Sequence, residues 1–418
     1  MAEGWTRRAA LWGGGFILLA GGGVMTARKP DRGGPHAPYF QKLTVALREG
    51  GFSRPTIVVD RARLDANIAA VRKTLDGTRL ATRVVVKSLP AHGLLDVVTR
   101  GVPTNRYMVF NGPMLVEIVR THPGADILLG KPLPVAEAAR VTAAIGPAAP
   151  QWLIDTGERL AQYVEMAKST GVALRVNFEV DVGLHRGGFA RAEDLAHAVD
   201  QAKAAGAIVT GLMGYDPHVP KVPDPARAYA SVQQKYEACK AVLAEKLQAD
   251  PASLTLNSAG SPTYALHAKA TAANEVAIGS AFVKPTDFDL KTLAHHAPAA
   301  FIATPVIKVL ARAEVPGLEP VTGIFNFFDP NTKRAVFIHG GHWLAKPESP
   351  PGLEYSALFG RSSNQELLTG SDAVDLQPDD YVFLRPTQSE AVFLQFGDIA
   401  VFDGERIVTT WPTFPVSA

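Results

Sequence analysis

Between about residues 50 and 290, short apolar runs alternate with longer segments whose apolar positions recur every three or four residues. Short runs rich in Val, Ile and Leu indicate buried strands, and the longer spacing indicates amphipathic helices. This alternation predicts parallel strands joined by helical crossovers. The predicted strands are 56–60, 83–87, 106–110, 126–129, 151–155, 174–181, 208–215, 254–258 and 276–283, and the predicted helices include 61–75, 134–145, 158–170, 192–205 and 226–247.

The number of predicted strands indicates the architecture. Without 56–60, eight strands remain, which is the number in a closed (β/α)8 barrel of the TIM type. Beyond about residue 296 the helical pattern stops, and turn signals such as Asp403-Gly404 separate short apolar runs. These runs, at 300–310, 335–339, 381–384, 392–396 and 399–402, predict an all-β domain. The expected fold class is therefore α/β: a barrel in 36–295, with strand 56–60 joining a β-domain in 296–418.

Residues 1–35 have a different composition and are excluded from the fold. Thr6-Arg7-Arg8 precedes an apolar, glycine-rich segment at 9–25, which Arg28-Lys29-Pro30 follows. This is the layout of a secretory signal, and the arginine pair indicates the twin-arginine route. Met25 stands where a cleavage site prefers a small residue, so an uncleaved membrane tether is an open alternative. We expect the protein in the periplasm or anchored at the inner membrane.

Composition excludes several classes of partner and site. The 42 Lys and Arg residues nearly balance the 40 Asp and Glu residues, which argues against nucleic acid as a partner. Cys239 is the only cysteine, so the chain has no intramolecular disulfide and no thiolate metal cluster. With 47% hydrophobic residues, the chain can bury a sizeable core.

Lys87 ends the predicted strand 83–87, and active sites of barrels lie at the carboxyl ends of the strands. Burial lowers the pKa of an amine, which allows a lysine to form a Schiff base with an aldehyde cofactor. The alternative is a lysine that merely extends to solvent.

Two further strand ends carry polar groups. Glu179, Asp181, His185 and Arg186 surround the passage from a strand to a glycine-rich loop, which indicates a ligand site rather than only a salt-bridged strand end. The next strand ends at Tyr215 and His218. Tyr215 could stack on a flat ring, and His218 could be an acid–base group or an ordinary capping imidazole; both roles for His218 stay open.

Loops of small residues follow the last two predicted strands, at 257–264 and 278–281. Hydroxyl groups and exposed backbone N–H groups at this place commonly hold a phosphate in barrels. Together with the strand-end lysine, arginine and tyrosine, they indicate pyridoxal phosphate as the cofactor. The candidate phosphate residues are Ser258, Gly260, Ser261, Thr263, Gly279 and Ser280.

These motifs resemble the fold-type III pyridoxal-phosphate enzymes, the alanine-racemase-like barrels, and most closely the D-threonine aldolase and D-serine dehydratase group. The resemblance rests on Arg83 and Lys87, on the Glu-x-Asp-x-Gly-x-x-Arg-x-Gly motif at 179–188, and on Gly-x-x-x-Tyr at 211–215. It implies that Lys87 holds the cofactor, Arg186 meets the ring hydroxyl and Tyr215 lies against the cofactor. A homodimer and a small amino-acid substrate are expected from the same resemblance.

The chain departs from this group at the metal. A His-x-Cys or His-x-Asp pair holds the group's metal, and Gln388 and Glu390 occupy those places here. Glutamine is a poor ligand for a transition metal, although Glu390 could bind a hard cation. His339 and His342 would point to different faces of an extended segment. We expect no metal.

The expected function is a lyase that acts on D-configured β-hydroxy amino acids, by aldolase cleavage or dehydratase elimination, with Lys87, Tyr215 and His218 as catalytic residues. An amino-acid racemase is the alternative, and a non-catalytic pyridoxal-phosphate-binding protein is a third hypothesis. Ala277 stands where alanine racemases place an arginine against the pyridine nitrogen, which makes the cofactor a poorer electron sink. The β-domain favours an enzyme, because small barrels that only bind the cofactor lack one.

Overall fold

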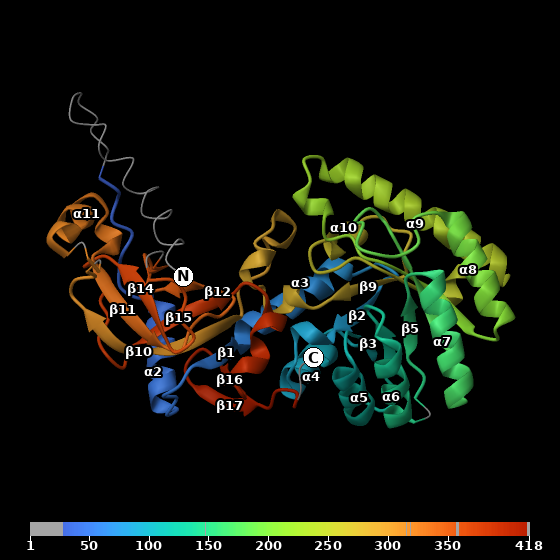
Figure 1. The fold of residues 1–418 in the computed structure, drawn as a ribbon, viewed down its shortest axis with the longest axis horizontal. Coiled ribbons are helices and arrows are strands. Elements are labelled where there is room, and N and C mark those ends of the chain that lie inside the picture. The colour runs from blue at the N-terminus through green and yellow to red at the C-terminus, as the bar shows by residue number, and fades with distance from the viewer. Residues whose placement is uncertain (1–27, 147, 315, 318, 357–358, 416–418) are drawn as a thin grey trace.

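The structure, a computed structural model, describes residues 28–146, 148–314, 316–317, 319–356 and 359–415. Two bodies lie side by side: a barrel with surrounding helices, and a sheet that holds the C-terminal strands and β1 (Figure 1). The predicted signal segment lies outside the described residues. Within them, no helix combines the length and the apolar character needed to cross a membrane.

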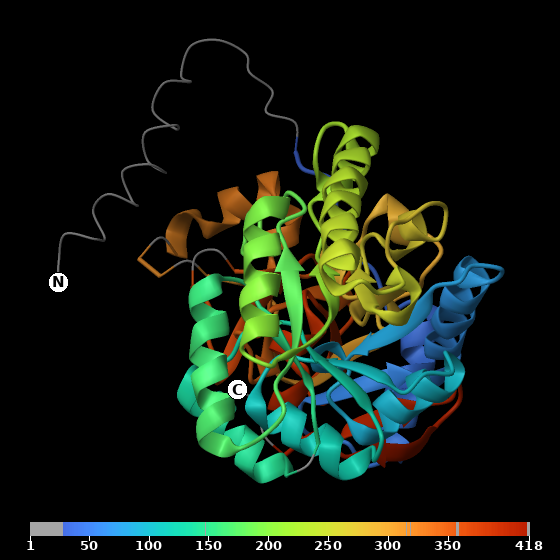
Figure 2. The ribbon, with the colours of Figure 1, turned by 90° about the vertical axis from the view of Figure 1, so that its right-hand side faces the viewer.

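Eight parallel strands close the barrel, which confirms the predicted fold class. Helices surround the strands, as Figure 2 shows from the barrel side. The strands are β2 (Ala81–Val85), β3 (Arg106–Val109), β4 (Asp126–Leu129), β5 (Gln151–Ile154), β6 (Arg175–Val180), β7 (Ile208–Gly214), β8 (Thr255–Ser258) and β9 (Glu275–Ile278). The helices are α3 (Arg61–Leu75), α4 (His92–Gly101), α5 (Gly112–Thr121), α6 (Val135–Ile145), α7 (Gly157–Thr170), α8 (Ala192–Ala204), α9 (Pro225–Leu247) and α10 (Tyr264–His267).

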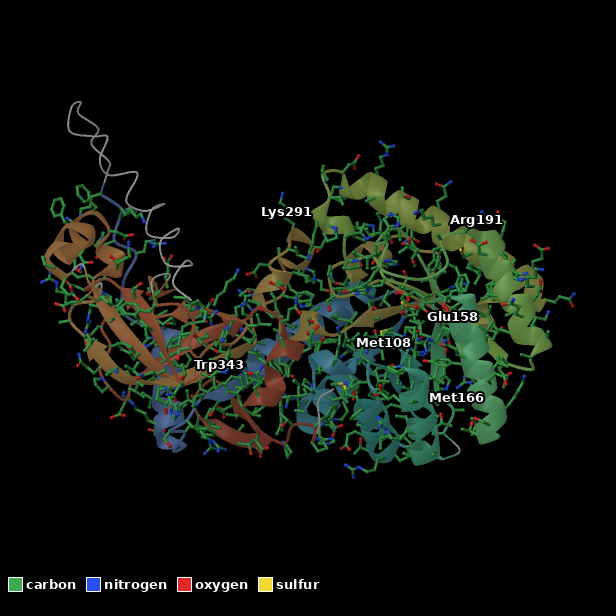
Figure 3. All side chains as sticks on the ribbon, viewed as in Figure 1. Met108, Glu158, Met166, Arg191, Lys291 and Trp343 are labelled. Carbon is green, nitrogen blue, oxygen red and sulfur yellow. The ribbon has the colours of Figure 1, made fainter. Side chains whose placement is uncertain are left out.

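The barrel strands form because their side chains are buried on both faces, as near-continuous apolar runs require. All residues of β5 and β9 are buried. Side chains fill the interior, and Met108 of β3 lies among them, whereas Glu158 lies on the helical exterior (Figure 3).

The fully buried Arg83 joins strands on either side of β2. It binds Glu275 of β9 at 2.6 Å and Asp126 of β4 at 2.9 Å, so a polar layer lies beneath the barrel mouth.

The second body is a nine-stranded sheet that also includes the predicted first strand, β1 (Thr56–Asp60). β1 pairs antiparallel with β10 and parallel with β16. Helix α2 (Pro38–Glu49) covers this sheet with Leu43 and Leu47, which pack against Val58 and Phe301. The other strands are β10 (Ala300–Leu310), β11 (Arg334–His339), β12 (Ala345–Ser349), β13 (Glu354–Tyr355), β14 (Gln365–Gly370), β15 (Tyr381–Pro386), β16 (Ile399–Phe402) and β17 (Ile407–Trp411).

Three local predictions were wrong. The predicted strand 392–396 is a 3-10 turn at Phe393–Gln395, because a short apolar run does not distinguish a strand from a buried turn. The strand predicted to reach residue 283 ends at Ile278, and a 3-10 turn follows it at Ser280–Phe282. The region beyond 296, expected to lack helices, contains α11 (Thr322–Phe328).

Candidate functional site

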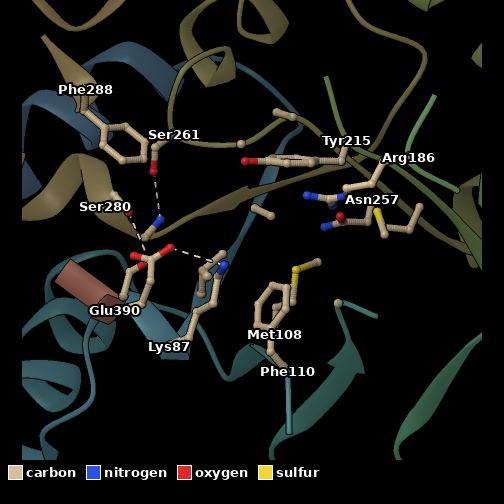
Figure 4. A pocket seen from close by; sticks show the side chains of 18 residues that line it. Lys87, Met108, Phe110, Arg186, Tyr215, Asn257, Ser261, Ser280, Phe288 and Glu390 are labelled. Atoms are coloured by element: carbon tan, nitrogen blue, oxygen red, sulfur yellow. Dashed lines mark hydrogen bonds and ion pairs between the residues drawn. The ribbon is translucent and has the colours of Figure 1, made fainter. Parts of the chain in front are cut away.

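A cavity opens at the carboxyl ends of the barrel strands (Figure 4). Its wall comes from residues in or just after six of the eight barrel strands and from the β-domain. Several predicted residues meet there. These are Lys87, Arg186, Tyr215, Gly260, Ser261, Gly279 and Ser280.

Lys87 lies on a 3-10 turn, Val86–Ser88, and not on the strand that the sequence predicts. The turn begins where β2 ends, so its side chain reaches the cavity. The ammonium nitrogen lies 3.2 Å from Oε1 of Glu390 and 4.5 Å from the centre of the Phe110 ring. A carboxylate and an aromatic face thus hold the cation at the barrel mouth.

Glu390 is contributed by the β-domain, from the 3-10 turn Ser389–Ala391 (Figure 4). Its Oε2 accepts a hydrogen bond from Ser88 Oγ at 3.4 Å. Ser88 Oγ in turn lies 3.1 Å from Ser280 Oγ. The β-domain therefore completes the cavity and places a carboxylate beside the strand-end lysine.

Arg186 and Tyr215 form the opposite side of the cavity (Figure 4). The guanidinium carbon of Arg186 lies 4.9 Å from the centre of the Tyr215 ring. Burial raises the pKa of the Tyr215 phenol, Arg186 opposes this shift and Glu390 adds to it. The ring is close to Gly260, where a Cβ atom would lie only 2.5 Å away. Tyr215 therefore stays protonated and offers a flat wall.

The loop that carries Arg186 is held from within. Asp181 Oδ1 accepts hydrogen bonds from the backbone N–H groups of Gly183 and His185, each at 3.0 Å. Its Oδ2 lies 2.8 Å from Nδ1 of His185, whose side chain is exposed. Burial raises the pKa of Glu179 to about 7, against the pull of Arg186. Only Arg186 of these four polar residues lines the cavity.

The two loops of small residues pack against each other. Ser261 Oγ accepts hydrogen bonds from the backbone N–H groups of Gly279 at 3.1 Å and Ala281 at 3.0 Å. A Cβ atom at Gly279 would lie 2.7 Å from Val85, so only glycine fits this approach. These contacts position Ser261, Gly279 and Ser280 together in the wall.

Three predicted site residues do not line the cavity. Ser258 Oγ donates to the carbonyl of Gly214 at 3.1 Å, and Thr263 Oγ1 donates to Asp216. His218 lies beside Gly183, and its buried Nδ1 has no hydrogen-bond partner among the described residues. Its catalytic role stays a prediction.

Sequence reasoning did not select several wall residues. Met108 lies just before the end of β3 and Phe110 just after it, where the rule that selects Lys87 also applies. Asn257 of β8 donates to Glu275 at 2.9 Å, and its own buried Oδ1 has no hydrogen-bond partner in the part of the chain that the structure describes. Phe288 follows the last barrel strand in the sequence, and no sequence pattern indicated that it lines the cavity.

The residues present fit pyridoxal phosphate. A lysine amine, a flat tyrosine ring and an arginine line one cavity, and glycines 260 and 279 allow the wall around them to pack closely. The two positions where the resemblance places metal ligands have other partners in this structure. Gln388 donates its amide to Asp287 at 2.9 Å and Glu390 contacts Lys87. The expected absence of a metal stays a prediction. The part of the chain that the structure describes holds no group of three or more His, Cys, Asp or Glu suited to a metal.

The family model described as "Alanine racemase, N-terminal domain" matches residues 59–286, more than half of the chain. A comparison with curated protein sequences gives no match. Among solved structures, D-threonine aldolase from Filomicrobium marinum is similar, with a TM-score of 0.68 at 15% identity over 86% of this chain and 96% of the other. D-threo-3-hydroxyaspartate dehydratase from Delftia sp. HT23 gives 0.66 at 16% identity, covering 86% and 97%. Alanine racemase from Bacillus anthracis gives 0.64 at 12% identity, covering 86% and 98%. At these identities the structures establish the shared fold alone.

Proposed function

The chain belongs to the alanine racemase N-terminal domain family, and on this premise we propose that it is a pyridoxal-phosphate-dependent lyase acting on D-configured β-hydroxy amino acids. When bound, the cofactor supplies an aldehyde and an electron-withdrawing ring. The observation that carries the proposal is Glu390, whose carboxylate lies 3.2 Å from the amine of Lys87.

The cavity residues take complementary roles in this proposal. Lys87 would hold the aldehyde carbon, and the flat face of Tyr215 would support the ring. Arg186, whose guanidinium lies over the Tyr215 ring, would donate to the ring oxygen. Ser261 and Ser280 would meet the phosphate with their hydroxyl groups, beside Gly279.

Glu390 supplies the proton acceptor that a lyase needs. Cleavage or elimination at the β-carbon removes or delivers a proton at the β-hydroxyl group, and a carboxylate within hydrogen-bond reach can perform this transfer. Glu390 lies on the same side of the cavity as Lys87 (Figure 4). It can therefore also exchange a proton with the Lys87 amine when that amine is released.

A racemase is the second candidate, because Tyr215 lines the cavity across from Lys87 (Figure 4). Racemisation needs a proton acceptor on each face of the substrate α-carbon. The raised pKa of Tyr215 keeps its phenol protonated and makes it a poor acceptor at neutral pH.

Incubation of the purified chain, from Arg28 onward, with pyridoxal phosphate and D-threonine tests the proposal. Chiral amino-acid analysis separates the outcomes. Glycine with acetaldehyde indicates an aldolase, and ammonia with a 2-oxo acid indicates a dehydratase. Threonine inverted at the α-carbon indicates a racemase and contradicts the lyase. Cofactor binding without turnover of any D-β-hydroxy amino acid tested would support the non-catalytic alternative.

We also propose that the protein is exported or tethered through residues 1–27. The support is the arginine pair Arg7-Arg8 before the apolar segment 9–25. The chain that follows is fixed to the β-domain, since Arg28 lies 5.5 Å above the ring of Phe327 and the backbone N–H of Lys29 donates to Phe328. Fractionation of cells that make the full chain tests this. The wild type should leave the cytosol, and Arg7→Lys/Arg8→Lys should retain it there.

A further inference from the structure

Asp216 follows Tyr215 directly, yet its side chain turns away from the cavity and is fully buried. Its Oδ1 accepts a hydrogen bond from Thr263 Oγ1 at 2.5 Å, and its Oδ2 accepts one from His267 Nε2 at 2.9 Å. Thr263 and His267 are also buried. Burial of a carboxylate is costly unless specific partners compensate it, so this arrangement needs an explanation.

The hydrogen bonds continue from Asp216 in both directions. Thr263 Oγ1 accepts from the backbone N–H of Gly260 at 3.2 Å, which joins Asp216 to the cavity loop. On the other side, His267 Nδ1 lies 2.8 Å from Thr271 Oγ1. One buried network thus connects the end of β7 with the loop after β8 and with helix α10.

The loop at the end of this network has a strained backbone. Ala259 has a φ of +65°, in the left-handed region that a residue with a Cβ atom rarely adopts. Such a conformation persists only where the surroundings determine it. Ala259 lines the cavity and belongs to the loop proposed to receive the phosphate.

We propose that Asp216 and His267 form a buried clamp that acts through Thr263 to hold loop 258–263 in this left-handed shape and so sets the affinity for a phosphate group. The inference rests on the proposed cofactor. Asp216 and His267 are positioning residues, because neither lines the cavity. A pair that only stabilised the fold would change the binding of every ligand, or of none. The clamp changes binding only of ligands that carry the phosphate.

Pyridoxal phosphate and pyridoxal differ only in the phosphate, so the ratio of their dissociation constants isolates the clamp. Thr263→Val keeps the shape of the side chain and removes its hydrogen bonds to Asp216 and Gly260. It should weaken pyridoxal phosphate binding on the order of tenfold and leave pyridoxal binding within about twofold. Thr263→Ser retains the hydroxyl and should bind both like the wild type. Titration followed by the absorbance of the bound ligand measures both constants in the full chain.

Glycine at 259 gives an independent readout, because glycine adopts the left-handed conformation without strain. In Ala259→Gly/Thr263→Val the loop no longer needs the clamp, so most of the lost phosphate preference should return. Asp216→Asn and His267→Gln should shift the affinity ratio in the same direction as Thr263→Val. Absence of recovery in the double variant overturns the proposal.

Thr304→Val is the matched control. Thr304 is also fully buried, and its hydroxyl donates to the carbonyl of His339 at 2.7 Å in the β-domain. This variant should lose stability without any change in the affinity ratio. If Thr263→Val weakens the binding of pyridoxal phosphate and pyridoxal equally, or weakens neither, the clamp proposal is wrong but the proposed cofactor is not contradicted. If the wild type binds neither ligand, the proposed function and the clamp fail together.

Discussion

Two cations lie four residues apart in the first segment of the barrel, and each faces a carboxylate. Arg83 and Glu275 are fully buried, and Arg83 also bonds to Asp126 and to the carbonyl of Tyr107. Lys87 and its partner Glu390 are partly exposed, with side-chain exposures of 35% and 24%. The deep pair is satisfied on every side and can only hold strands together. The pair at the mouth keeps its amine within reach of the cavity.

The largest effect that would test this difference is on activity. Lys87→Ala should abolish the lyase reaction, with a loss of at least about 10⁴-fold, because no other group at the mouth can hold the cofactor aldehyde. The free energy of unfolding in urea should change little, since the Lys87 side chain is partly exposed. Substantial turnover by Lys87→Ala would show that another amine carries the chemistry.

Arg83→Met should instead lower the stability of the fold. It leaves Glu275 buried without its main partner, which typically costs about 3–5 kcal/mol. Urea unfolding should show this loss of stability. Arg83→Lys, which retains the charge but not the two-pronged geometry, should lose less. A fully stable Arg83→Met would mean that the deep pair does not hold the barrel.

The sequence predicted the deep parts of the fold better than the mouth. Strand and helix patterns sufficed for the barrel, because the buried faces of its elements repeat with regular periods. The rule that strand ends carry chemistry selected Lys87, Arg186 and Tyr215, all of which line the cavity. This rule needs only the sequence around each strand end, so it can be applied without knowing the fold of the rest of the chain.

Glu390 shows where reasoning from local patterns stopped, because only the resemblance to the aldolase group placed it at a ligand position. It is 302 residues from Ser88, its hydrogen-bond partner, and it reaches the cavity on a turn of another domain. The pattern around it gave the wrong local structure, since the apolar run 392–396 forms a 3-10 turn. The packing of the β-domain against the barrel brings Glu390 to Ser88. Neither segment has a hydrophobic periodicity that predicts this contact. The same holds for the clamp at Asp216, whose partners lie in a different loop.

Glu390→Gln should reduce turnover by about 10²–10³-fold, the usual contribution of a general base. The amide keeps the shape and the contact with Ser88, so stability and cofactor affinity should change little. Glu390→Asp, with a shorter reach to Lys87, should retain more activity than the glutamine variant. Equal rates for Glu390→Gln and the wild type would show that the contact between Lys87 and Glu390 is only structural, like that between Arg83 and Glu275.

Glu179 of β6 offers a pH test next to the loop that carries Arg186. Its folded-state pKa of about 7 is raised from 4.5, so the folded protein binds the proton more tightly than the unfolded chain. Stability should therefore fall as pH rises from about 4.5 to 7, by about 3 kcal/mol in total. Glu179→Gln should remove most of this slope in urea unfolding measured at several pH values. An unchanged slope would place the responsible proton on another group.

The smallest expected effect is that of a chelator. Glu390 contacts Lys87 and Gln388 donates to Asp287, so both side chains at the expected metal-ligand positions already have partners. Treatment with a chelator, followed by assay with and without added divalent cations, should change turnover by less than about twofold. A larger loss, restored by one metal, would show that Glu390 turns from Lys87 to a cation during catalysis. In that case the contact between Lys87 and Glu390 would exist only in the absence of substrate. The Lys87 pair would then differ from the Arg83 pair because Glu390 can change its partner, and not because the pair is more exposed.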